Sequence, residues 1–115
     1  WVYISSTDPG SVLRCPIGDV LPGPPIEILD GAEMAIADGL AIYPDGTLFI
    51  AGFGTGKVYA WTDVEGLQTV AESPNMGLFG TASIAFGEAP GFGATTLYAT
   101  NLLKPVLEVV DMAVE

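Results

Sequence analysis

Short apolar segments alternate with turn residues along the whole chain. Val, Ile, Leu, Tyr and Phe gather in short runs, and Gly, Pro or Asp bounds each run. Runs of this kind are typical of β-strands. Gly and Pro interrupt every window long enough to hold an amphipathic helix, and no helical period stands out. The pattern therefore predicts an all-β protein.

Several of the predicted strands are apolar on both faces. The segments are LAIY (40–43), LFIA (48–51) and VYAW (58–61). A strand with one face in water would alternate between apolar and polar residues, so these strands are predicted to be covered on both sides. Trp1, Trp61 and the other aromatic residues follow the same strand positions, which predicts that they belong to the core.

Three segments of the chain resemble one another. They are WVYISST (1–7), TLFIAGF (47–53) and TLYATNL (96–102), and they place Tyr3, Phe49 and Tyr98 at separations of 46 and 49 residues. The middle repeat also contains a fourth predicted strand, LQTVAES (67–73). A period of this length with four short strands is typical of a β-propeller blade.

The repeats predict a partial β-propeller. We expect about two and a half four-stranded antiparallel blades of a six-bladed ring, in segments 1–31, 32–73 and 74–115. Such a chain would leave apolar blade faces open at both ends, and soluble monomers seldom expose faces of that size. The expected partners are therefore the remaining blades of the same protein or further copies of this chain.

Composition and charge narrow the possible functions. The chain has 14 acidic residues against three cations, no His, one Cys and a net charge of -11. Three cations cannot neutralise many phosphates, so we expect neither nucleic-acid nor anionic-membrane binding, and no apolar run reaches membrane-spanning length. The absence of His excludes Ser-His and Cys-His triads and His-ligated zinc. Cys15, in an apolar run, is predicted to be a buried structural thiol.

Two Asp-Gly pairs invite different interpretations. Asp45-Gly46, in the sequence PDG, is predicted to form a tight hairpin turn. Asp38 precedes Gly39 at the start of the predicted innermost strand of the second blade. Carboxylates that meet at a channel mouth repel one another unless a cation joins them, and calcium takes oxygen ligands of this kind. Asp38 is therefore either a metal ligand or a residue that caps a turn.

Three further residues are weaker candidates for substrate binding. When Tyr43 is aligned with Phe86, Thr81 falls at the position of Asp38. Its hydroxyl would then hydrogen-bond a ligand, or Thr81 would have only a structural role as a β-branched strand residue. Met76 and Phe79 lie in the connection AESPNMGLFGT (71–81) and would form either an apolar lip for substrate or a plug between blades. The Gly-rich segment GFGTG (52–56) is predicted to be a hairpin loop, because a phosphate site would need a helix after it.

The segment ADGLAIYPDGTLFIAGFGTGKVYAW, followed by TASIAFGEAPGFGATTLYAT, resembles the gluconolactonase / senescence-marker-protein family. Members of that family are six-bladed propellers that bind calcium. The resemblance covers roughly residues 36 to 101. Strictosidine-synthase-like and NHL-type propellers share part of the same pattern and are alternatives.

The resemblance implies a calcium-dependent hydrolase of a lactone or related ester. Asp38 matches the family's Pro-Asp-Gly aspartate, a calcium ligand and proposed general base, although Ala37 replaces the Pro. The resemblance implies calcium, or another divalent cation, as the cofactor. The family's other ligands, a Glu and Asn residues from earlier blades, would lie upstream of this chain. A different class of function also stays open, namely a non-catalytic propeller or assembly module.

Overall fold

The computed structural model of the chain describes residues 1–8, 10–18, 23–34, 36–72, 80–88, 90–101 and 107–111. These residues form three antiparallel sheets of three, four and three strands. The first sheet contains β1 (Val2–Ser6), β2 (Ser11–Cys15) and β3 (Ile26–Asp30). The predicted all-β class is therefore confirmed.

The second and third sheets follow in chain order. The second contains β4 (Ala37–Ile42), β5 (Leu48–Gly52), β6 (Lys57–Thr62) and β7 (Gly66–Glu72). The third contains β8 (Thr81–Phe86), β9 (Thr96–Asn101) and β10 (Leu107–Asp111). The described helical structure is one short 3-10 turn, η1 (Ala32–Met34), between the first two sheets. Within the described ranges, no helix has the length and hydropathy to cross a membrane.

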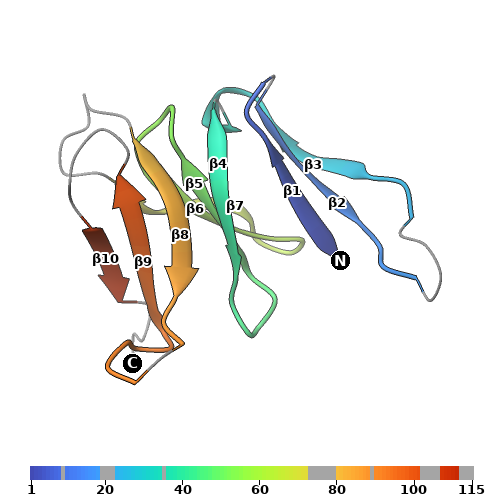
Figure 1. Cartoon of the computed structure of the whole chain (residues 1–115). Helices are drawn as coiled ribbons and strands as arrows, with labels where there is room; N and C mark the ends of the chain where they lie inside the picture. Colours follow the sequence, from blue (N-terminus) through green and yellow to red (C-terminus); the bar gives the residue numbers. More distant parts are fainter. Residues whose placement is uncertain are drawn as a thin grey trace.

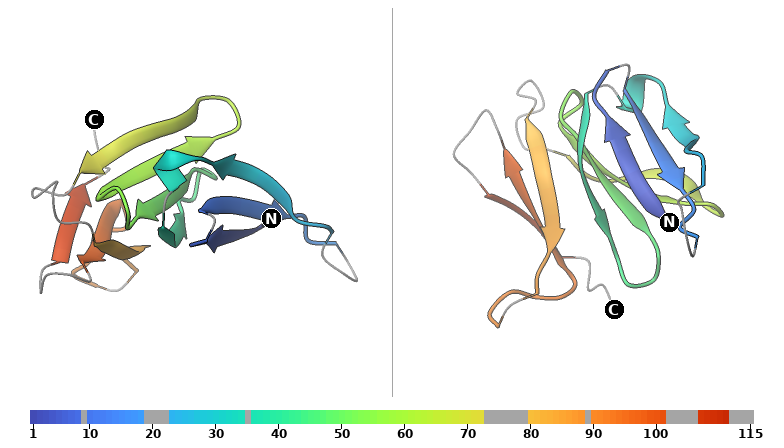
Figure 2. Two further views of the ribbon diagram at one scale, coloured as in Figure 1. Left: turned by 90° about the horizontal axis from the view of Figure 1, so that it is seen from above. Right: turned by 45° about the vertical axis from the view of Figure 1, so that its right-hand side comes forward.

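The three sheets lie next to one another in sequence order (Figure 1). Within each sheet every strand pairs with the strand before or after it in the chain. Strand β4 packs against both β1 and β8, so these three strands stand side by side from three different sheets. Seen from above, the outer strands diverge from this row (Figure 2).

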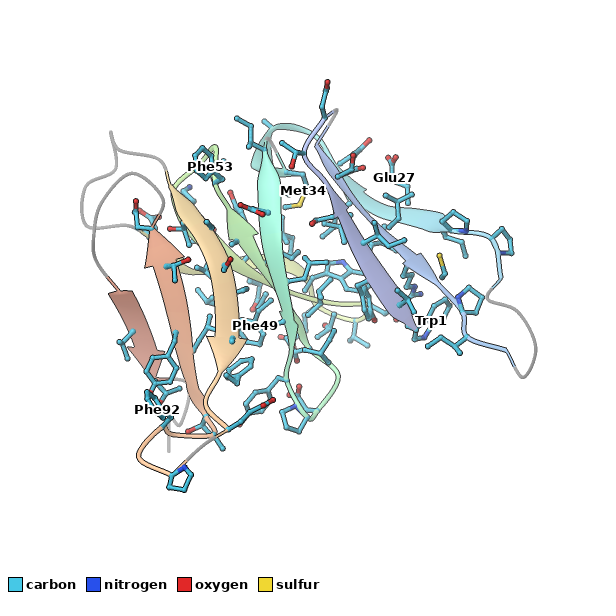
Figure 3. All side chains as sticks on the ribbon, in the orientation of Figure 1. Trp1, Glu27, Met34, Phe49, Phe53 and Phe92 are labelled. Atoms are coloured by element: carbon cyan, nitrogen blue, oxygen red, sulfur yellow. The ribbon has the colours of Figure 1, made fainter. Side chains whose placement is uncertain are left out.

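Two apolar clusters fill the spaces between the sheets. One joins the first sheet to the second and is built around Met34, Leu48 and Ile50. The other joins the second sheet to the third, with Phe49 on β5 and Leu97 on β9 (Figure 3). All five residues of β5 are buried, because its alternate side chains enter the two clusters. This confirms that LFIA is covered on both sides.

The aromatic residues are not all in the core. Phe49 and Tyr59 are buried, and Trp61 is half-buried against the first cluster. Trp1 is 55% exposed just before β1, so its predicted place in the core is wrong (Figure 3). The periodicity extended the predicted strand to Trp1, but β1 begins at Val2, so Trp1 lies one residue outside the strand.

Asp45-Gly46 forms the hairpin turn between β4 and β5, as predicted. The amide of Gly46 donates to the carbonyl of Tyr43 at 2.8 Å, and Gly46 has a φ of 94°. The Asp45 carboxylate accepts the amide hydrogen of Thr47 at 2.9 Å. The side chain thus imitates a backbone turn, and the glycine provides a φ that is costly for other residues. The segment 52–56 is likewise the turn between β5 and β6.

A polar clamp also joins the first two sheets. The Arg14 guanidinium on β2 bonds both oxygens of Asp63, at 3.2 and 3.3 Å, and lies 4.0 Å from the centre of the Trp1 ring. Burial lowers the pKa of Arg14, but its interactions with Asp63 and Tyr3 raise the pKa by more. The guanidinium is therefore held in its charged form between the sheets.

Candidate functional site

At each junction between sheets a hydrogen bond joins the end of one strand to the start of the next sheet, but the donor lies on opposite sides of the two junctions. At the first junction, β1 packs on β4 and the Thr7 hydroxyl donates to the carbonyl of Ala37 at 3.2 Å. At the second, β5 packs on β8 and the Gly80 amide donates to the carbonyl of Phe53 at 3.1 Å. Thr7 and Phe53 occupy the same position of the sequence repeat. Hence β1 is the structural equivalent of β5, one sheet earlier.

Asp38 lies at the second position of β4, beside this first junction. Its side chain is exposed, and its backbone carbonyl accepts the Ser5 hydroxyl at 2.6 Å. Within the described part of the chain, no hydrogen bond or ion pair holds the Asp38 carboxylate. The next residue, Gly39, lies directly against the backbone of Ala82 and Ser83 on β8. The Asp38 carboxylate is thus open to solvent at the end of a row of three adjacent strands.

The strand register corrects the predicted equivalence of Asp38 and Thr81. A bulge lies between Ala37 and Leu40 on β4, and a bulge at the same place on β8 lies between Thr81 and Ile84. This register matches Thr81 to Ala37, so Ala82 is the equivalent of Asp38. Thr81 is 1% exposed and therefore buried at the start of β8.

Alignment of Tyr43 with Phe86 caused this error of one residue. Phe86 is the last residue of β8, whereas Tyr43 lies one residue beyond the end of β4. Their rings nevertheless touch, with centres 5.0 Å apart. The other two substrate-binding candidates, Met76 and Phe79, lie outside the described residues, as does Leu78.

The residues near Asp38 do not form a calcium site by themselves. Among the described residues, no group of three or more Asp, Glu, Cys or His side chains is placed to hold a metal ion. Calcium takes about six to eight oxygen ligands, and the carbonyl oxygen of Asp38 already accepts a hydrogen bond from Ser5. The described residues around Asp38 therefore supply its carboxylate but not the group of ligands that a calcium site needs.

Backbone strain lies two residues before Asp38, at Ile36, and no pattern in the sequence indicated it. Ile36 has a φ of 53°, which is rare for a β-branched residue. Its equivalent in the third sheet is Gly80, whose φ is 139°. Both junctions thus turn into the inner strand through a positive φ. A glycine makes the turn at one junction and a strained isoleucine at the other.

The sequence also gave no indication of a hollow on the second sheet, away from Asp38. It has a volume of about 260 Å³ and lies at the end of the sheet that carries the turns after β4 and β6. Aromatic rings and carboxylates line it, among them Tyr43, Trp61, Asp45 and Glu65. Asp38 is not one of its lining residues.

Comparison of the chain with family models, with curated proteins and with solved structures found no match.

Proposed function

We propose that this chain forms three consecutive blades of a larger β-propeller. Three antiparallel sheets in chain order, with the edge strands β4 and β8 of the second and third sheets adjacent, support the proposal. The positive φ of Ile36 and of Gly80, each one residue before the first strand of the next sheet, supports it further. Propeller blades have this radial repetition, with the innermost strands of successive blades side by side.

Within that propeller, Asp38 is the proposed carboxylate of a hydrolytic site for a lactone or related ester. The observation that carries this proposal is the exposure of its carboxylate at the start of an inner strand. A carboxylate that no protein group holds is available to accept a proton from an attacking water molecule. The resemblance of residues 36–101 to the gluconolactonase / senescence-marker-protein family points to the same residue.

Calcium is the proposed cofactor of the complete propeller rather than of the described residues. Because these residues offer one carboxylate, the remaining oxygen ligands would come from other parts of the assembly. The substitution Asp38→Asn is expected to weaken calcium binding to that assembly, as measured by isothermal titration calorimetry. Asp45→Asn is the matched control, since Asp45 is the turn aspartate, and it should leave calcium affinity unchanged.

A kinetic assay on a panel of lactones tests the hydrolase directly. Removal of a general base lowers kcat by about 10²- to 10⁴-fold, so Asp38→Asn should fall in that range while Asp45→Asn retains activity. Equal activities of the two variants would exclude Asp38 as the base. Strictosidine-synthase-like or NHL-type chemistry would be indicated if the propeller forms but hydrolyses no lactone.

A non-catalytic assembly module is the second candidate function. Large apolar side chains are exposed on β1, on β10 and in the connection between β8 and β9, with Val2 42%, Ile4 43%, Val109 58% and Phe92 55% exposed. Exposed apolar residues in such numbers favour contact with further protein. A stable complex that neither binds calcium nor turns over a lactone would support this function over the hydrolase.

A further inference from the structure

The first sheet lacks a strand that its two neighbours possess. In the second sheet β4 pairs along the edge of β5, and in the third sheet β8 pairs along the edge of β9. The sequence repeat makes β1 the equivalent of β5 and β9. Yet among the described strands β1 pairs with β2 alone and forms the edge of its sheet. Within the described part of the chain, the pairing position that β4 and β8 occupy is therefore open on β1.

The face of β1 that points away from the second sheet is also open, because Val2 and Ile4 alternate with Tyr3, which packs toward the second sheet. Val2 and Ile4 on β1 are 42% and 43% exposed. Their equivalents on β5, Leu48 and Ile50, are both 0% exposed, and those on β9 are 0% and 1% exposed. The same strand positions are thus fully covered in two sheets and open in the first. An apolar edge strand of this kind readily accepts another strand through its backbone.

We propose that the edge of β1 binds an extended β-strand of the type represented by β4 and β8. The strand would add antiparallel to β1, as β4 adds to β5 and β8 to β9. Strand addition of this kind takes its affinity from main-chain hydrogen bonds and its specificity from alternate side chains. The proposal depends on strand pairing and not on the proposed hydrolase.

The two existing pairings define the side chains of this partner strand. In both pairings, a small residue of the added strand, β4 or β8, faces the last residue of the strand that it pairs with. Ala37 of β4 faces Gly52 of β5, and Thr81 of β8 faces Asn101 of β9. After two bulge residues comes an aliphatic residue, Leu40 or Ile84. An alanine and then a bulky apolar residue follow in both strands: Ala41 and Ile42, and Ala85 and Phe86.

These positions map directly onto β1. The small residue of the partner would face Ser6 and the aliphatic residue would face Ile4. The alanine would face Tyr3, which is half-buried toward the second sheet, and the bulky residue would face Val2. The partner is thus a strand of pattern small-x-x-aliphatic-Ala-bulky, without cations at the positions that face β1.

A peptide with the sequence of residues 80–88, extended by terminal lysines for solubility, is the probe. Hydrogen exchange of the chain with this peptide should show slowed exchange in β1. Exchange in β7, the edge of a four-stranded sheet, should not change. A scrambled peptide with the same lysines controls for attraction to the net charge of -11. Protection of β7 equal to that of β1, or equal binding of the scrambled peptide, would overturn the proposal.

Two edge substitutions complete the test. Lysine on an edge strand opposes strand addition, so Ile4→Lys should weaken peptide binding by at least about tenfold. Thr69→Lys, at an exposed position of β7, should leave the affinity unchanged. Sedimentation of the chain alone distinguishes a second copy as the occupant. If the chain self-associates, Ile4→Lys abolishes this association and the peptide does not displace it, the occupant of the β1 edge is a second copy. That result would contradict the proposed type of partner strand.

Discussion

A Cβ atom at Gly39 would lie 2.5 Å from the carbonyl oxygen of Ala82, in the neighbouring sheet. The backbones of β4 and β8 approach each other directly at this point, one residue after Asp38. Glycine is therefore required here for close packing and not for a turn. The glycines of the two Asp-Gly pairs therefore have different roles. Gly46 adopts the positive φ of a turn, whereas Gly39 leaves room for the neighbouring backbone.

The substitution Gly39→Ala should destabilise the protein. Overpacking of a closely fitted contact costs about 1–3 kcal/mol, and the atoms in contact are backbone, which cannot rotate away. Urea denaturation of the two proteins measures the difference. Asp38→Ala is the adjacent control and should change the free energy of unfolding by less than about 0.5 kcal/mol. Equal stability of Gly39→Ala and the parent chain would show that β4 and β8 are not in this contact.

Strain at Ile36 predicts an unusual response to glycine. Ile36 and Ile42 are 44% and 48% exposed, so each loses similar contacts on replacement by glycine. Ile36 alone has a positive φ, which costs about 1–2 kcal/mol for a residue with a side chain. Ile36→Gly should therefore be at least about 1 kcal/mol less destabilising than Ile42→Gly. Thermal denaturation of the two variants measures this difference in stability. Equal losses of stability in Ile36→Gly and Ile42→Gly would argue against strain at Ile36.

The turn aspartate should matter for stability and not for chemistry. Asp45→Ala removes the hydrogen bond from the Thr47 amide and should cost about 0.5–1.5 kcal/mol. Asp45→Asn keeps an oxygen acceptor and should recover most of that stability. Both values come from denaturant titration at neutral pH. A loss of equal size in both variants would mean that the carboxylate charge, rather than the Asx hydrogen bond, stabilises the turn.

The clamp between the first two sheets depends on the shape of the Arg14 side chain. Arg14→Lys keeps the charge but loses the bidentate contact with Asp63 and the stacking on Trp1. Stacking of this kind contributes about 0.5–1 kcal/mol at exposed sites. Asp63 is 66% exposed, so Asp63→Asn should cost less than Arg14→Lys. Tryptophan fluorescence during denaturant unfolding measures the free energy of unfolding of both variants. If Asp63→Asn cost more than Arg14→Lys, the charge of the Arg14 side chain rather than its shape would stabilise the contact.

Cys15 should react slowly with thiol reagents in the native state. Its side chain is 8% exposed at the end of β2, where the sequence predicted a buried thiol. Labelling then requires local opening, which costs a few kcal/mol in ordered strands. The native rate should therefore be at least about a hundredfold below the rate in urea. Comparable rates would show that the face of the first sheet opens freely.

The strands could be read from the sequence because apolar runs and turn residues are local signals. The both-sided burial of β5 followed from its lack of alternation, and the Asp45-Gly46 turn followed from the residues themselves. These local signals could not predict which residue of β4 corresponds to which residue of β8. A bulge adds a residue without changing the apolar pattern, so the aromatic residues alone aligned the strands one residue out of step.

The candidate site was predicted less completely than the fold. The sequence placed Asp38 near the start of a strand, and in the structure it is the second residue of β4, with its side chain exposed. Strain at Ile36 and the backbone contact of Gly39 depend on how two sheets meet, which no local pattern records. In the part of the chain that the structure describes, no group of three or more Asp, Glu, Cys or His side chains is placed to hold a metal ion, so the local pattern around Asp38 does not complete a site. Local sequence patterns therefore identify the Asp38 carboxylate but not the groups that surround it.

The neighbour-only pairing of the strands has a consequence for how the protein assembles. Each described strand pairs with strands adjacent in the chain, so most hydrogen bonds close short loops. Short loops cost little entropy to close, which favours rapid folding for a protein made of strands. The sheets then behave as a one-dimensional array, in which each unit stabilises the next. Opening should start at the first and third sheets, and β5, enclosed on both sides, should be the last strand to exchange its amide hydrogens.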